Sequence, residues 1–219
     1  MEKEKEKFPE HLGHLNKTFL EELNYKLWST KGARFQAHNR LISKNNKSVT
    51  AIAFLTAYLI IFGLIGVYQN VEEPFIPAHY IGFGSMAGSI LVLIFAQLDG
   101  AQDYKLNAHL YHFCALEIGQ LYNQIRIRKT IENPMAESDY EFCIKLEKKY
   151  TDLLTKYPNH EEIDHKLFMI SKPDYFKNLS KFQIRLWHLI YFLKTSLIYY
   201  TFILAPPVLF TIYWLWYLN

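Results

Sequence analysis

VTAIAFLTAYLIIFGLIGVY at residues 49–68 and YIGFGSMAGSILVLIFAQL at residues 80–98 decide the fold of this chain. Neither stretch contains Asp, Glu, Lys or Arg, and eleven residues of the first are Leu, Ile, Phe or Val. A helix of about 20 residues is about 30 Å long, which matches the hydrocarbon core of a bilayer. The two stretches therefore predict two transmembrane helices.

A short acidic segment, QNVEEPFIPAH at residues 69–79, joins the two stretches. Pro74 and Pro77 stop both helices, so the segment predicts the loop of a transmembrane hairpin. The loop carries Glu72 and Glu73, whereas seven basic residues lie between His14 and Ser48. By the positive-inside rule, the loop faces outward and both flanking segments face the cytoplasm.

The average composition hides this pattern. The chain has 219 residues, 24 Lys and Arg against 21 Asp and Glu, and half of its residues are hydrophobic, as in a slightly basic soluble domain. Ten basic and six acidic residues lie within 1–48, however, and thirteen of each lie within 99–185. The nearly uncharged stretches between these segments exclude intrinsic disorder and a single soluble core.

A third apolar stretch, residues 186–218, contains Lys194 as its one charged residue and has Tyr and Trp side chains near both ends. Aromatic side chains at both ends suit a helix that crosses the bilayer, which would leave the C-terminus extracytoplasmic. The alternative is an interfacial helix up to about Ala205, followed by a hinge at Pro206 and Pro207 and a short dip into the bilayer.

The remaining sequence has the three-and-four apolar spacing of amphipathic helices and no useful strand alternation. Helices are expected near 102–129, 137–157 and 163–170, with Asn133 and Pro134 ending the first of them. The predicted fold is an all-α integral membrane protein. Its predicted parts are a charged tail (1–13), a cytoplasmic amphipathic helix (14–48), the transmembrane hairpin (49–98), a cytoplasmic helical region (99–185) and a C-terminal membrane segment (186–219).

Small residues on the spans are candidates for helix packing or oligomerisation: Gly63, Gly66, Gly82, Gly84, Ser85, Gly88 and Ser89. Gly84 and Gly88 form a G-x-x-x-G pair, which lets another helix approach closely. That helix is either the hairpin partner or a second copy of the chain, so a homo-oligomer is one expectation. In an oligomer, hydroxyl side chains could line a pore: Thr50, Thr56, Ser85 and Ser89.

No pattern of catalytic residues is recognisable, and we expect neither an enzyme nor a bound cofactor. His109 and His112 lie near Glu117, but this spacing does not place all three on one helix face, so no metal site is predicted. The two cysteines, Cys114 and Cys143, lack metal-ligand spacing and are expected to be reduced thiols. No ionisable residue lies at the midpoint of a span, which argues against a coupled transporter.

Two segments that flank the hairpin resemble SLATT domains, which are bacterial two-transmembrane effector modules. They read WSTKGARFQAHNRL from Trp28 and AQDYKLNAHLYHFCALEIGQLYNQIR to Arg126. The residues that carry the resemblance are Trp28, Lys31, Ala33, Arg34, His38, Arg40, Ala108, His109, Tyr111, Leu121, Tyr122 and Arg126. The resemblance covers about residues 14–170, and the late apolar segment looks like the C-terminal membrane region of one branch of these domains.

The resemblance implies an effector in antiphage defence that oligomerises, opens the bacterial inner membrane and arrests growth by abortive infection. It also implies an upstream sensor, such as a nucleotide second-messenger synthase or a reverse transcriptase, and no direct binding of nucleic acid. The alternative is a membrane-anchored helical scaffold that docks or restrains a soluble defence partner and conducts nothing.

Overall fold

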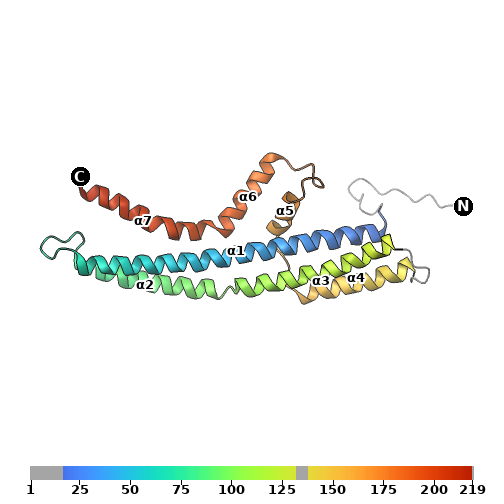
Figure 1. The fold of residues 1–219 in the computed structure, drawn as a ribbon, viewed down its shortest axis with the longest axis horizontal. Coiled ribbons are helices and arrows are strands. Elements are labelled where there is room, and N and C mark those ends of the chain that lie inside the picture. Colours follow the sequence, from blue (N-terminus) through green and yellow to red (C-terminus); the bar gives the residue numbers. More distant parts are fainter. Residues whose placement is uncertain (1–16, 132–137, 219) are drawn as a thin grey trace. The chain divides into compact units, whose positions relative to one another are not determined.

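A computed structural model describes residues 17–131 and 138–218, which form seven α-helices (Figure 1). The helices are α1 (Phe19–Tyr68), α2 (Ala78–Gly100), α3 (Tyr104–Thr130), α4 (Asp139–Lys156), α5 (Glu162–Ile170), α6 (Lys181–Thr195) and α7 (Leu197–Leu218). The described residues contain no strand, which confirms the all-α prediction. The predicted tail at 1–13 and the predicted helix end at Asn133 and Pro134 lie outside the described residues.

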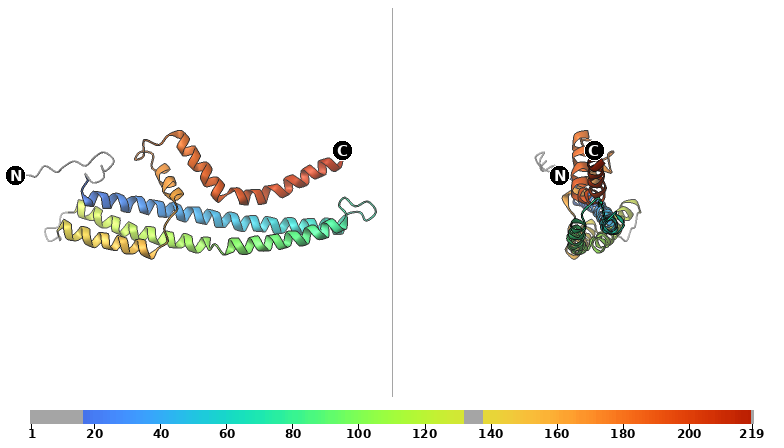
Figure 2. Two further views of the ribbon diagram at one scale, coloured as in Figure 1. Left: turned by 180° about the vertical axis from the view of Figure 1, so that it is seen from behind. Right: turned by 90° about the vertical axis from the view of Figure 1, so that its left-hand side faces the viewer.

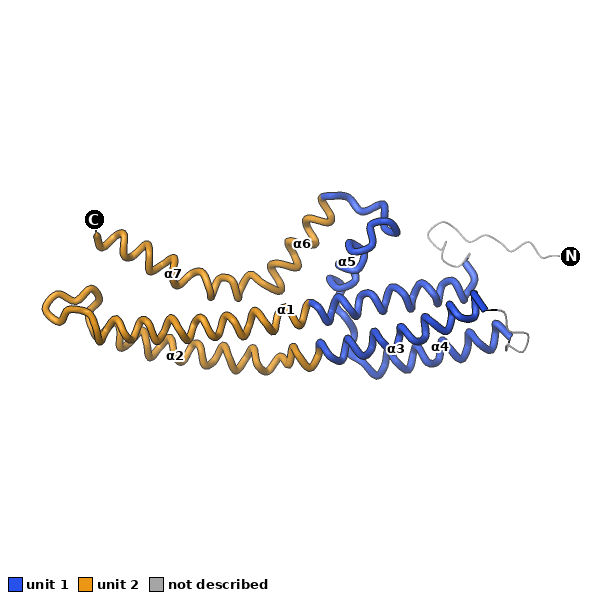
Figure 3. Tube along the Cα trace, viewed as in Figure 1, with its two compact units in different colours: residues 1–39, 108–181 blue, residues 40–107, 182–219 orange. Residues whose placement is uncertain are grey.

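The chain divides into two compact units (Figure 3). Unit 1 comprises residues 1–39 and 108–181, and unit 2 comprises residues 40–107 and 182–219. Both α1 and α3 contribute residues to each unit. The polar helix and the first span predicted from the sequence are therefore one continuous helix of 50 residues.

The start of α1 is fixed by a capping box. The backbone N–H of Thr18 donates to the Glu21 carboxylate at 3.0 Å, and the N–H of Glu21 donates to the Thr18 hydroxyl at 3.3 Å. These two bonds satisfy donors that a helix start leaves unpaired. No proline interrupts the chain from there to Tyr68, so the helix continues from its polar half into its apolar half.

Unit 1 has a conventional apolar core between α1, α3 and α4, and α3 and α4 lie side by side in both views (Figures 1 and 2). Its buried members are Leu23, Leu27, Cys114, Ile118, Leu121, Ile125, Leu146 and Tyr150. The α3 members recur at intervals of three and four residues, so they share one helix face. The amphipathic spacing in the sequence therefore corresponds to real burial here.

Helix α5 packs against α1 at Gly32. A Cβ atom built on Gly32 would lie 2.1 Å from two ring carbons of Phe168, so only glycine allows this approach. The Trp28 ring meets the same Phe168 ring edge to face, with centroids 4.8 Å apart. Aromatic packing against a backbone without a side chain thus holds α5 in place.

Three helices of the described chain are long and apolar enough to cross a membrane, within Phe19–Tyr68, Ala78–Thr130 and Leu197–Leu218. In unit 2, α1 and α2 form the predicted hairpin. The Gln69 side chain closes its loop, because its amide both donates to the Ile76 carbonyl at 2.7 Å and accepts from the Ile76 N–H at 3.1 Å. The Phe75 ring of the same loop packs against Tyr213 and Tyr217 of α7.

The third apolar stretch differs from the prediction in where it breaks. Helix α6 ends at Thr195, α7 begins at Leu197, and the chain changes direction between them (Figure 1). Pro206 and Pro207 lie inside α7, so the alternative in which the helix ends near Ala205 is wrong. Each proline removes one backbone hydrogen bond from the helix. For the carbonyl that Pro207 leaves free, a neighbouring helix supplies a replacement donor, described below.

Candidate functional site

The residues that carry the family resemblance do not form one cluster. Arg34, His38, His109 and Tyr111 lie in unit 1 near the start of α3. Trp28, Lys31, Tyr122 and Arg126 lie in unit 1 on another part of α1 and α3. Arg40 lies in unit 2 and is buried.

Arg34 is a buried cation that fixes the connection between α4 and α5. Its side chain is 1% exposed, and its guanidinium donates to the Pro158 carbonyl and, at 3.4 Å, to the Asn159 side-chain oxygen. The Tyr111 hydroxyl donates to the Asn159 carbonyl at 2.9 Å, and its ring lies 5.5 Å from the guanidinium carbon. Arg34 of α1 and Tyr111 of α3 thus both bind Asn159 in this loop, and Arg34 also binds Pro158.

This buried cation influences a neighbouring histidine. Burial, reinforced by the charge of Arg34, lowers the pKa of His160 to about 4. Burial also lowers the pKa of His165, whose Nε2 lies 3.0 Å from the Ser29 hydroxyl of α1. Both imidazoles are therefore neutral at pH 7, and this part of unit 1 is built around uncharged histidines.

The histidines of α3 pack against α1. The His38 Nδ1 donates to the Ala108 carbonyl at 3.0 Å, and its ring centroid lies 4.9 Å from that of His112 and 6.4 Å from that of His109. Glu117 instead accepts hydrogen bonds from Tyr157 and Lys156. Within the described ranges, no three His, Cys, Asp or Glu side chains come together in a way that could hold a metal ion.

The second group of motif residues forms a surface of aromatic and basic side chains. The Lys31 ammonium lies over the Tyr122 ring, 4.7 Å from its centroid. The Trp28 ring lies 4.7 Å from the Tyr175 ring, centroid to centroid. Burial lowers the pKa of Lys31, and the charges of Lys172 and Arg126 lower it further.

In unit 2, the glycine pattern packs the hairpin. A Cβ atom at Gly84 would lie 2.9 Å from the Phe62 ring, and one at Gly88 would lie 2.5 Å from Leu59. A Cβ atom at Gly66 would lie 3.0 Å from Ile81. The G-x-x-x-G face of α2 is therefore turned toward α1 of the same chain.

The other small residues are placed differently. A Cβ atom at Gly63 would meet the Ser85 hydroxyl at 4.0 Å, and that hydroxyl is buried without a hydrogen-bond partner. Gly82 has no heavy atom within 4 Å of a built Cβ atom, and both Gly82 and Ser89 are exposed. Gly82 and Ser89 thus remain on the outer face of the hairpin.

Three of the four candidate pore-lining hydroxyls hydrogen-bond within their own helices. Thr50 donates to the Asn46 carbonyl at 2.8 Å, Thr56 to the Ile52 carbonyl at 2.9 Å, and Ser89 to the Ser85 carbonyl at 2.7 Å. Such bonds let a hydroxyl sit at membrane depth without an external partner.

A carboxylate at the end of α2 joins three helices, and it is absent from the sequence predictions. Asp99 accepts hydrogen bonds from Ser48 of α1, from Tyr199 of α7 at 2.8 Å, and from Tyr104 of α3 at 3.4 Å. Tyr199 is 1% exposed and Ser48 is 5% exposed. Ser48 directly precedes the first span and Asp99 directly follows the second, so a hairpin brings them to the same end. This placement is the sequence feature that could have predicted their contact.

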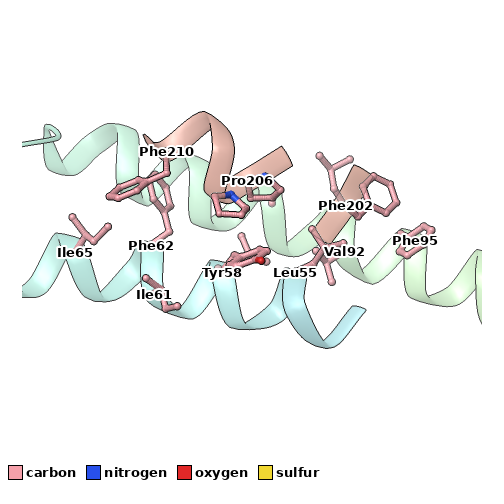
Figure 4. A pocket seen from close by; sticks show the side chains of 14 residues that line it. Leu55, Tyr58, Ile61, Phe62, Ile65, Val92, Phe95, Phe202, Pro206 and Phe210 are labelled. Atoms are coloured by element: carbon pink, nitrogen blue, oxygen red, sulfur yellow. The ribbon is translucent and has the colours of Figure 1, made fainter. Parts of the chain in front are cut away.

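A second polar contact explains how α7 tolerates its prolines. Pro207 has no N–H, so the Ile203 carbonyl four residues earlier has no partner in its own helix. The Tyr58 hydroxyl of α1 donates to that carbonyl at 2.8 Å. Around this contact, α1, α2 and α7 enclose an apolar groove of about 560 Å³, lined by Leu55, Val92, Phe202 and Phe210 among others (Figure 4).

Comparison with known proteins identifies the family. Residues 16–213 match SMODS and SLOG-associating 2TM effector domain family 5. The chain belongs to this family of effector domains. This confirms the resemblance to SLATT domains. The match extends past residue 170 and includes α6 and most of α7, so the third apolar helix is part of this SLATT domain. No curated protein and no solved structure matches the chain.

Proposed function

We propose that this SLATT domain is a non-enzymatic effector of a bacterial antiphage defence system, which oligomerises in the inner membrane and permeabilises or depolarises it when activated. The family assignment supports a membrane effector associated with conflict systems. The positive-inside pattern supports a cytoplasmic N-terminus and an extracytoplasmic C-terminus.

The observation that carries this proposal is the way α7 is held against the hairpin. Polar contacts bind it at two levels, Tyr199 to Asp99 and the Ile203 carbonyl to Tyr58, and an apolar groove borders the second contact. The groove is lined mainly by apolar side chains, so it leaves space into which the bordering side chains can move when α7 shifts. Release of two polar contacts would free the inner faces of the three helices for contact with other copies.

Activation is proposed to come from a separate sensor, such as a nucleotide second-messenger synthase or a reverse transcriptase, acting on unit 1. Helix α1 has residues in both units and no break between them. A rotation or shift of its first half is therefore transmitted through a continuous backbone to its second half.

The test is induced expression in bacteria with a potential-sensitive dye, paired with dye release from liposomes that contain the purified chain. We expect depolarisation, growth arrest and release of small dyes, each enhanced by Tyr199→Phe. Unchanged membrane potential and intact liposomes, with the protein present in the membrane and with Tyr199→Phe included, would refute permeabilisation.

Oligomerisation is tested on the outer glycine. We expect Gly82→Leu to reduce self-association measured by cross-linking, because a bulky side chain on the outer face blocks the close approach of a second copy. The hairpin itself should stay intact, since the new side chain has free space within its own chain. Gly84→Leu is the matched control and should instead disrupt the hairpin against Phe62. Equal cross-linking of Gly82→Leu and the unmodified chain would show that the surface around Gly82 does not mediate self-association.

The scaffold alternative is favoured by one observation. Several large apolar side chains of α3 and α4 are exposed, including Phe113 (53%), Ile127 (56%) and Tyr140 (75%). A soluble partner could cover them. Copurification of a stoichiometric partner without any leakage from liposomes would support this alternative over permeabilisation.

A further inference from the structure

A groove on the surface of unit 1 has a composition unlike the rest of that unit. It encloses about 350 Å³, and four of its lining residues are aromatic: Tyr25, Trp28, Tyr122 and Tyr175. Tyr25 and Tyr175 stack with an interplanar angle of 18°, and Tyr175 is 57% exposed. An exposed aromatic face beside a groove offers a stacking surface for a planar ring.

Three basic side chains lie beside this groove. Lys31 is held over the Tyr122 ring, and Arg126 follows Tyr122 by one turn of α3. The carbonyl of Lys172 accepts the N–H of Tyr175 at 3.1 Å, so the chain turns there and keeps the two residues close. Burial is the main cause of the lowered pKa of Lys31, and the nearby charges of Lys172 and Arg126 lower it further. Three positive charges therefore converge beside the aromatic surface.

Within the described part of unit 1, these three cations lack the acidic ion-pair partners that other basic residues have. Lys26 pairs with Glu22 at 2.6 Å, and Lys156 pairs with Glu117 at 3.3 Å. Across residues 17–131 and 138–218, no carboxylate forms an ion pair with Lys31, Arg126 or Lys172.

The groove has one carboxylate of its own. That carboxylate, on Glu21, accepts hydrogen bonds from Thr18 at the start of α1, and Lys17 also lines the groove. Glu21 is thus committed to the helix cap. An excess of unpaired positive charge is a recognition surface for an anion.

We propose that this groove binds an aromatic phosphate of about mononucleotide size, with its ring on Tyr25 and Tyr175 and its phosphate groups on Lys31, Arg126 and Lys172. Ring stacking and charge-assisted hydrogen bonds are the two contacts that such a ligand offers together. The binding site goes beyond the proposed function and does not depend on it, because ligand binding is measurable without any change in the membrane.

The test uses the full chain in phosphatidylcholine nanodiscs and equilibrium dialysis with three probes: ATP, inorganic triphosphate and adenosine. We expect saturable ATP binding that is tighter than that of either other probe. Arg126→Glu should weaken ATP binding about tenfold or more, since a charge-assisted contact becomes a repulsion. Lys148→Glu, the same change at an exposed position of α4, should leave binding unchanged.

A second pair of variants isolates the ring contact. Tyr175→Ala should reduce the preference for ATP over inorganic triphosphate, whereas Tyr140→Ala, at another exposed tyrosine, should not. The proposal is overturned if ATP shows no saturable binding at millimolar concentration, if Arg126→Glu and Lys148→Glu bind alike, or if triphosphate binds as tightly as ATP. Loss of ATP binding with normal liposome leakage would refute this site and leave the proposed function standing.

Discussion

Polar side chains make up a larger share of the buried residues in unit 2 than in unit 1. In unit 1 the buried residues are mainly apolar, as in the cluster of Leu27, Ile118 and Leu146, and Arg34 is a buried exception. In unit 2 many large apolar residues of the spans are exposed, whereas the buried set includes Ser48, Thr195 and Ser196. The two units share helices and differ in what covers them.

The difference follows from the surrounding medium. In water, apolar surface is driven inward, so a helix with one apolar stripe finds a core. In lipid that force between helices vanishes, and small residues and polar contacts decide which faces meet. Unit 2 uses Gly84, Gly88 and the Asp99 carboxylate for this purpose. It follows that stability in the two units responds to different substitutions.

The largest effect is expected at Arg34, the buried cation of unit 1. Arg34→Ala removes the donors for Pro158 and Asn159 and leaves a cavity, and it should destabilise the α4–α5 connection by about 3 kcal/mol. Hydrogen exchange of the α5 amides measures this opening free energy. Lys148→Ala, at an exposed position, is the control and should change it by less than about 0.5 kcal/mol.

A pair of glycine substitutions compares the packing of the two units directly. Gly32→Ala should cost about 2 kcal/mol, because the Phe168 ring occupies the space for a methyl group. Gly88→Ala should cost less than about 1 kcal/mol, because Leu59 and Gly88 both border the apolar groove and the leucine can turn into it. Hydrogen exchange of α5 and of the hairpin measures both. Equal costs at the two glycines would contradict the looser packing of unit 2.

Acidification should weaken unit 1 selectively. The pKa of His160 is lowered to about 4 in the folded chain, against an ordinary value of 6.5, and that of His165 is also lowered. The unfolded chain then binds more protons between these values, so stability falls as the pH drops below about 6.5 and continues to fall toward 4.

Hydrogen exchange of the α5 amides as a function of pH, corrected for the intrinsic exchange rate, measures this loss. Down to about pH 5, the expected loss is smaller than that of Arg34→Ala. His160→Gln should flatten the profile, leaving the smaller part that belongs to His165. A profile that His160→Gln leaves unchanged would assign the loss to other groups.

The smallest effect is expected at the polar contact of unit 2. Tyr199→Phe removes one hydrogen bond to Asp99 and should destabilise the docking of α7 by about 1 kcal/mol. A double-mutant cycle with Asp99→Asn measures the coupling between the two residues. The readout is the accessibility to a thiol reagent of a cysteine introduced into α7. A loss as large as that of Arg34→Ala would show that unit 2 depends on this carboxylate more than its half-buried position at a helix end suggests.

Much of the fold was predictable because the deciding interactions are local. Insertion of residues 49–68 and 80–98 depends on the sum of their own transfer free energies, and the structure has helices there. The short helix expected at 163–170 is α5, Glu162–Ile170. The break at Ser196 was not predictable, because prolines are the usual signal for a break and none lies there. The helix instead continues through Pro206 and Pro207, where Tyr58 hydrogen-bonds to the carbonyl that Pro207 leaves free.

The candidate sites depended on residues far apart in sequence. The family resemblance rests partly on Trp28, Lys31, Tyr122 and Arg126. No sequence pattern indicates that Tyr175 lies beside them. Asp99 reads as the first residue of a polar segment, whereas its partner Tyr199 is 100 residues away. The sequence contains no local pattern that links such residues.

The sequence by itself determined that the chain is helical, that it has three apolar stretches long enough to span a bilayer, and that it resembles SLATT domains. These properties are sums over neighbouring residues. Only the tertiary structure decided that Gly84 and Gly88 pack the hairpin while Gly82 stays outside, and that Asp99 meets α7. Such choices depend on which helix faces meet, and in lipid that is decided by a few small and polar contacts and not by the apolar pattern.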